Sequence, residues 1–157
     1  MERRRRWFVL IEALLVGALV AGGCAESDPP QKKDPPQKTA EPTTEYTSEK
    51  GVRVTVEQPL AEAVVESPLE VKGRAPGAWS FEADFPVEIL DADRRRIVEG
   101  YATMQGEWMT EDDVDFIGEI EFEPPASGMG ILVLHRANPS GLEKNDDAVE
   151  IPVRFGP

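Results

Sequence analysis

An acidic cluster is the first group of side chains in this sequence that could do chemistry. Five carboxylates lie within nine residues: Glu107, Glu111, Asp112, Asp113 and Asp115. Clustered carboxylates are candidate ligands for calcium, which takes several oxygen ligands. The spacing is not that of an EF-hand loop, and Asn145, Asp146 and Asp147 would add ligands only if the fold brought them close. We therefore expect a solvated acidic loop, with no metal site and no other cofactor.

The single histidine, His135, is a second candidate for chemistry. It ends an apolar run over residues 131–135 and precedes Arg136. A catalytic histidine needs a nucleophile and an orienting acid beside it, but no nucleophile motif such as G-x-S-x-G occurs. We expect a structural histidine at a strand end, no catalytic residues, and a protein that is not an enzyme.

Two tryptophans, Trp79 and Trp108, fall in or beside predicted loops. Exposed aromatic rings stack on sugars or bind pockets of a protein partner. The two residues are therefore candidates for partner binding, including binding of carbohydrate or peptidoglycan. The alternative is that they cover the open end of the folded domain, since cores use such rings too.

The only cysteine, Cys24, ends a segment that has the parts of an export signal. Residues 3–6 are four arginines, residues 7–21 are apolar apart from Glu12, and Gly22 and Gly23 follow. The apolar run of 15 residues is shorter than the roughly 20 that a membrane-spanning helix needs. A basic start, a short apolar stretch and small residues before a cleavage point are typical of a secretory signal.

The tetrapeptide at residues 21–24, Ala-Gly-Gly-Cys, resembles the lipobox of bacterial lipoproteins, although Ala21 stands where leucine is commoner. The resemblance implies removal of residues 1–23 as a signal peptide, a diacylglyceryl group on the Cys24 thiol and acylation of the new amine. Several acyl chains give a stable membrane anchor, whereas one is marginal. We expect an extracytoplasmic protein held in the cell membrane by lipid, or in the outer membrane where the cell has two. The alternative is an uncleaved N-terminal anchor helix.

Residues 24–50 are predicted to form a proline-rich, disordered tether. The segment lacks an apolar cluster and contains the sequence D-P-P-Q-K twice, at residues 28–32 and 34–38. Proline and charge keep such a chain extended and unable to bury a core. A spacer between membrane and domain is the favoured interpretation, and a proline-motif ligand for a partner is the alternative.

From residue 51 onward, apolar and polar residues alternate with a period of two, which is typical of half-buried strands. Turn-forming Pro, Gly, Asn and Asp residues separate the runs. The pattern predicts an all-β fold, an immunoglobulin-like antiparallel β-sandwich of about seven strands over residues 51–157. Pro86 and Pro152 lie within strands and predict edge or bulged positions. The predicted strands cover residues 52–57, 69–74, 81–89, 95–104, 116–123, 131–135 and 149–155.

One segment carries a more specific signature. Residues 65–75, V-E-S-P-L-E-V-K-G-R-A, contain the element S-P-L-x-V-x-G-x-A, and the strands that follow complete a pattern over about residues 52–155. This pattern resembles the immunoglobulin-like domain of bacterial spore-germination proteins, found beside the GerM module or alone in lipoproteins. The resemblance implies a β-sandwich in an envelope protein without enzymatic activity, linked to sporulation or germination. Ser67-Pro68 and Gly73 have a structural interpretation, as a turn and a close backbone approach.

The charge of the chain limits the partners that it can bind. The formal net charge is −13, and without the first 23 residues, which hold four Arg and two Glu, it is −15. Such a surface repels nucleic acid and anionic lipid. The only basic run of the domain, residues 94–96, follows two aspartates and predicts a charged hairpin tip. We expect a non-enzymatic envelope lipoprotein whose partners are an envelope protein or the cell wall.

Overall fold

Nine strands and two short 3-10 helices make up the described part of the computed structural model, residues 42–126 and 128–156. No helix among these residues has the length and hydropathy needed to cross a membrane. The elements, in chain order, are β1 (Thr44–Thr47), β2 (Arg53–Gln58), β3 (Val64–Val65), β4 (Leu69–Pro76), η1 (Gly77–Trp79), β5 (Asp84–Asp91), β6 (Arg96–Met104), β7 (Asp113–Ile120), β8 (Gly128–His135), η2 (Glu143–Asn145) and β9 (Ala148–Phe155).

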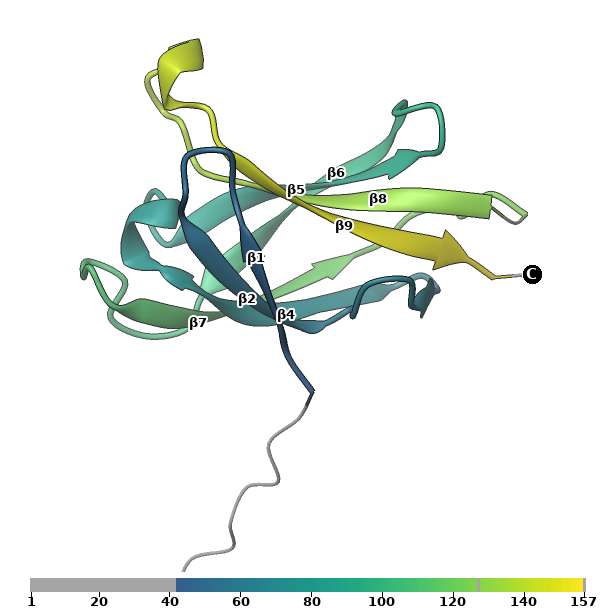
Figure 1. The fold of residues 1–157 in the computed structure, drawn as a ribbon, viewed down its shortest axis with the longest axis horizontal. Helices are drawn as coiled ribbons and strands as arrows, with labels where there is room; N and C mark the ends of the chain where they lie inside the picture. Colours follow the sequence, from purple (N-terminus) through teal and green to yellow (C-terminus); the bar gives the residue numbers. More distant parts are fainter. Residues whose placement is uncertain (1–41, 127, 157) are drawn as a thin grey trace, which may run out of the picture. The chain divides into compact units, whose positions relative to one another are not determined.

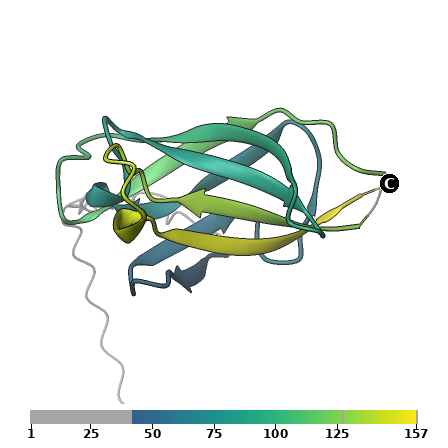
Figure 2. The same ribbon diagram turned by 90° about the horizontal axis from the view of Figure 1, so that it is seen from above.

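The strands pair in the order β1-β2-β4-β7-β6-β5-β8-β9-β3, and every pair is antiparallel except β3 with β9. Figure 1 shows two layers, with β2, β4 and β7 in one and β5, β6, β8 and β9 in the other. The layers join where Ala102–Met104 of β6 pairs with Phe116–Gly118 of β7. Figure 2, viewed from above, shows the strands of one layer crossing over those of the other. The all-β, immunoglobulin-like prediction is confirmed.

The core fills the space between the layers. Alternate residues of the long strands point inward and are almost fully buried, as the period of two requires. Phe85 of β5 and Phe116 of β7 meet edge to face, with ring centroids 5.1 Å apart. The buried cluster draws on every long strand of the described residues, so this part of the chain contains a complete core of its own.

The seven predicted strands match the seven longest observed ones to within a few residues. The two additional strands, β1 and β3, are short. Strand β1 corrects the predicted end of the tether at residue 50, because residues 44–47 pair with β2 and bury part of Tyr46 against the core. Residues 24–41 of the predicted tether lie outside the described residues.

Two further predictions about strands were wrong. Pro86 was expected at an edge or a bulge, but β5 lies inside the sheet, between β6 and β8. Pro86 falls just outside the stretch of β5 that pairs with β8, which begins at Val87. Phe81 was expected to begin a strand and face inward. It lies instead in a tight turn, and β5 starts at Asp84.

Gly73 confirms the predicted close backbone approach. It lies on β4 between Val56 of β2 and Phe116 of β7. A Cβ atom at this position would stand 2.1 Å from the Thr55 carbonyl oxygen and 2.8 Å from the edge of the Phe116 ring. Only glycine therefore lets the two neighbouring strands and the Phe116 ring keep their places.

We predict that Gly73→Ala destabilises the domain by about 3 kcal/mol, because the added methyl group meets backbone that cannot move aside. Chemical denaturation followed by tryptophan fluorescence measures the change. Lys72→Ala on the same strand is the control, with an expected change below about 1 kcal/mol, since its ion pair with Glu70 is only half-buried. Equal stabilities of wild type and Gly73→Ala would contradict the packing argument.

Candidate functional site

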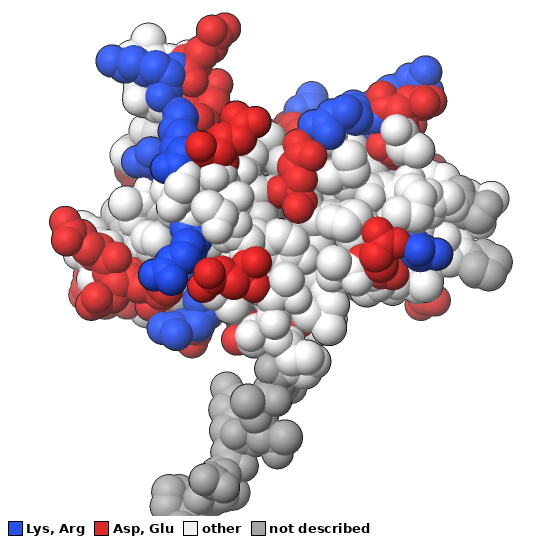
Figure 3. Space-filling view, viewed as in Figure 1, with Lys and Arg blue, Asp and Glu red and all other residues white. Residues whose placement is uncertain are grey.

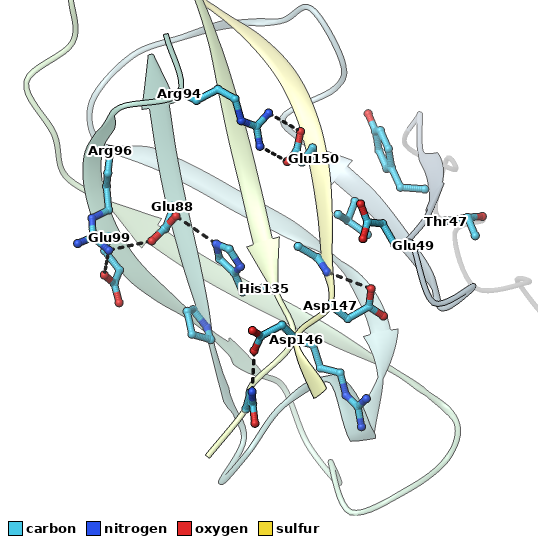
Figure 4. A pocket seen from close by; sticks show the side chains of 16 residues that line it. Thr47, Glu49, Glu88, Arg94, Arg96, Glu99, His135, Asp146, Asp147 and Glu150 are labelled. Carbon is cyan, nitrogen blue, oxygen red and sulfur yellow. Dashed lines mark hydrogen bonds and ion pairs between the residues drawn. The ribbon is translucent and has the colours of Figure 1, made fainter. Parts of the chain in front are cut away.

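A charged groove of about 970 Å³ lies on the outer face of the layer formed by β5, β6, β8 and β9. Its lining side chains point out from these strands, from the turn before β6 and from β1 (Figure 4). Most are charged or polar, so the groove could bind an extended polar ligand. The lining residues are Tyr46, Thr47, Glu49, Pro86, Glu88, Arg94, Arg96, Glu99, His135, Arg136, Asn138, Asp146, Asp147, Ala148, Val149 and Glu150.

Arg96 holds two carboxylates at one side of the groove. Glu88 and Glu99 face each other across β5 and β6, an arrangement that would repel without a cation between them. The Arg96 Nη1 donates to Glu88 at 2.9 Å and to Glu99 at 2.6 Å. The other oxygen of Glu88 lies 3.2 Å from Nε2 of His135 on the next strand, β8. Figure 4 shows the three strands linked through these side chains.

Arg94 pairs with a third carboxylate of the groove, that of Glu150. It lies in the β5–β6 turn with a positive φ of 61°, and its guanidinium donates to both oxygens of Glu150 on β9, at 3.1 and 2.6 Å. The turn is fixed by Asp91, whose Oδ1 accepts from the backbone N–H groups of Asp93 and Arg95. The hairpin tip therefore reaches across β8 to β9. This confirms the predicted charged tip.

One outward-facing residue of this layer is almost fully buried although it does not line the groove. Val133 of β8 faces outward between the inward-facing Leu132 and Leu134, yet only 3% of its surface is exposed. Glu88 and Glu150 are its register partners on the two neighbouring strands. The aliphatic parts of such side chains cover apolar surface while their charged ends stay in water. The ion pairs thus keep the side chains over Val133.

The pKa values of both carboxyls are lowered. Burial alone would raise the pKa of Glu88, but the hydrogen bonds from Arg96 and His135 and their charges outweigh it. The hydrogen bond from Arg94 lowers the pKa of Glu150 against the opposing effect of burial. Both groups are ionised at neutral pH. A general acid requires a raised pKa, so neither suits that role.

Asp147 and Ser48, both buried, join β9 to the turn between β1 and β2. The Ser48 hydroxyl donates to Asp147 at 2.7 Å and accepts from the Val52 N–H at 3.0 Å. Asp147 also accepts from the N–H groups of Lys50 and Ala148. Each polar group gains a partner, as burial requires. From its sequence position Asp147 was only a candidate metal ligand, and the structure gives it this role in packing.

The carboxylates considered as candidate calcium ligands lie in two separate places. No group of three or more metal-binding side chains is found in the described ranges 42–126 and 128–156. The acidic loop borders a separate hollow with Arg74, which pairs with Asp115 at 2.8 Å. Asp146 lies in the charged groove, where it accepts from Asn138. The two acidic stretches that the sequence analysis considered together line different hollows.

The two tryptophans lie in different environments. Trp79 is 1% exposed and packs in the core, so its ring cannot stack on a ligand in this conformation. Trp108 is partly buried against the same core. Binding of a partner by these residues stays a prediction. Of the two, only Trp108 has exposed surface that a partner could contact. Cys24, the predicted lipidation site, lies outside the described residues.

The groove was not predicted as a site. Its charged residues come from strands β5, β6, β8 and β9 and from the connections beside them, and those on the strands follow an ordinary alternating pattern. The run of three arginines was the one signal available, because β-hairpin tips place such residues near neighbouring strands. Their acidic partners could be found only from the order of the strands in the sheet.

The fold and the groove define an immunoglobulin-like β-sandwich with a charged outer face. Residues 53–143, more than half of the chain, match the family described as the immunoglobulin-like domain of bacterial spore germination. The chain belongs to that family, which confirms the resemblance seen in its sequence. No curated protein and no solved structure matches the chain.

We predict that Arg96→Gln raises the pKa of Glu88 and leaves that of Glu150 unchanged. Arg94→Gln should raise the pKa of Glu150 and leave that of Glu88 unchanged. Each carboxyl loses the cation that stabilises its ionised form. A titration of the side-chain carboxyl carbons by NMR measures both values in each variant. A pKa of Glu88 that stays the same in Arg96→Gln would contradict the pairing shown in Figure 4.

The same pairs make the unfolding free energy depend on pH. A carboxyl whose pKa is lowered on folding stabilises the folded state above its unfolded pKa, near 4.5 for Glu. That contribution is lost as the pH falls through the folded pKa. We therefore expect Arg94→Gln to lose less stability than wild type between neutral pH and about pH 3. Urea denaturation at both pH values measures this, and an equal loss in the two proteins would refute it.

Proposed function

We propose that this chain is a non-enzymatic lipoprotein that holds an immunoglobulin-like domain outside the cytoplasm, for interaction with an envelope protein or the cell wall. Lipid on Cys24 would fix the location, and the proline-rich segment after it would give the domain reach. The membership of the germination family supports a role during sporulation or germination.

The observation that carries the proposal is that two carboxylates of the charged groove are ionised and paired with arginines. These carboxylates, Glu88 and Glu150, have lowered pKa values and are bound by arginines. The hydroxyl residues that line the groove, Tyr46 and Thr47, have no hydrogen bond to a base among the described residues. A pair of acid–base catalysts needs pKa values pushed apart, and nucleophilic catalysis needs an activated nucleophile. The groove therefore favours recognition over reaction. Binding of carbohydrate by both tryptophans is not part of the proposal, because Trp79 is buried.

We expect the protein extracted from membranes to begin at Cys24 and to carry acyl chains on that residue. Mass spectrometry of the intact protein and of its N-terminal peptide measures both features. The Cys24→Ser variant should appear unprocessed or in the soluble fraction, because a single acyl chain or none does not give a stable anchor.

Ala25→Ser is the matched control, since it alters the neighbouring residue and leaves the thiol. It should be processed and retained in membranes as the wild type is. An intact Met1 terminus, or an unmodified Cys24 in protein purified from membranes, would refute the lipoprotein assignment.

A further inference from the structure

Four connections meet at one end of the sandwich, and we name this end the loop end: residues 48–52, 77–83, 105–112 and 136–147. The strand register places them together, since Pro76 of β4 faces Asp113 of β7 and His135 of β8 faces Ala148 of β9. Backbone hydrogen bonds tie the second connection to the third and the fourth. The Gly77 N–H donates to Asp112, and the Ala137 N–H donates to Trp79.

Three of these connections each expose one large apolar side chain. Phe81 is 51% exposed, Met109 75% and Leu142 51%. Phe81 lies in a two-residue turn closed by hydrogen bonds with Asp84, in which Glu82 and Ala83 both have positive φ. Loops held by a rigid sandwich often carry binding residues.

The surroundings of these side chains are acidic. The loop end holds eight carboxylates against three cations, Lys50, Arg136 and Lys144. Lys50 is engaged with the Lys144 carbonyl and Arg136 with the Ala78 carbonyl. In Figure 3, carboxylates gather at the left of the molecule, over the connection that leads into β7. Arg94 and Arg96 of the charged groove, in contrast, are paired with carboxylates of that groove.

Strand β1 runs toward the loop end, because Thr44 pairs with Val56 of β2 while Thr47 pairs with Arg53 at the start of that strand. Thr44 itself lies about halfway along the sheet, since Val56 pairs with Gly73 in the middle of β4.

We propose that the loop end is a docking surface for a cationic segment of a partner protein, with Phe81, Met109 and Leu142 in contact with its apolar side chains. This inference rests on the proposed interaction function and names its partner by chemistry. The carboxylates attract a basic segment and steer its approach, while they repel anionic lipid and nucleic acid. The apolar side chains supply contact area that charge alone would not.

A synthetic amphipathic peptide of leucine and lysine is the probe. It is titrated by calorimetry into residues 25–157, which contain the complete core, beside a serine–lysine peptide of equal charge. We expect the triple variant Phe81→Ser, Met109→Ser, Leu142→Ser to weaken binding of the leucine–lysine peptide by about tenfold or more. Binding to the wild type should also weaken as salt is raised.

The matched control is Val64→Ser, Tyr101→Ser, Met129→Ser, which removes three exposed apolar side chains outside the loop end. It should bind as the wild type does. The single variant Met109→Ser, at the most exposed position, replaces the triple variant if the latter does not fold.

Three results would overturn the proposal: equal affinity in wild type and loop-end variant, an equal loss in the matched control, or equal affinity for the serine–lysine peptide. Binding of anionic vesicles through the same three side chains would overturn it in favour of a membrane surface. The test uses unlipidated protein, so its failure leaves the processing of Cys24 untouched, and a failure of lipidation leaves this result unaffected.

Discussion

The position of the Phe116 ring is the constraint on which the rest of the domain depends. The ring lies over Gly73 of the neighbouring strand and against the edge of Phe85 from the other layer. Because Phe116 also belongs to the stretch of β7 that pairs with β6, one residue takes part in both the curl of the sheet and the packing of its layers. The inward faces of the strands then fill the remaining space as alternation requires.

The outer faces follow from the same order of strands. Once β6, β5, β8 and β9 lie side by side, Glu99, Glu88, Val133 and Glu150 form a row across them. Three carboxylates in one row would repel each other, and each of them pairs with Arg94 or Arg96 from one hairpin. The result is a face whose charges are satisfied internally. The loop end differs, because its carboxylates outnumber its cations and its apolar side chains are uncovered.

Much of the fold could be predicted from sequence, because apolar and polar residues alternate along a half-buried strand. The seven long strands, the β5–β6 hairpin and the role of Gly73 were all found in this way. Strand β1 was missed because four residues with the sequence T-E-Y-T follow a polar, proline-rich stretch and bury only one large side chain. Phe81 was assigned to the core because alternation alone does not reveal a turn with two left-handed residues.

The candidate sites were harder to predict, since they depend on which strands become neighbours. No local pattern places Arg94 beside Glu150, which is 56 residues away. Trp79 and Trp108 were candidates because they are tryptophans near predicted loops. Whether the Trp79 ring is buried depends on the packing around η1. The sequence before residue 42 carries a different kind of information. There the prediction rests on the resemblance of residues 21–24 to a lipobox and not on packing.

Photocrosslinking in intact cells tests the central claim most directly. A photoreactive amino acid is placed at position 109 in the loop end or, as a control, at the similarly exposed position 101 on β6. The account predicts that position 109 of the membrane-bound protein crosslinks to one envelope protein through a basic segment, and that position 101 does not. Crosslinks from position 101 alone, or equal crosslinks from both positions, would contradict it.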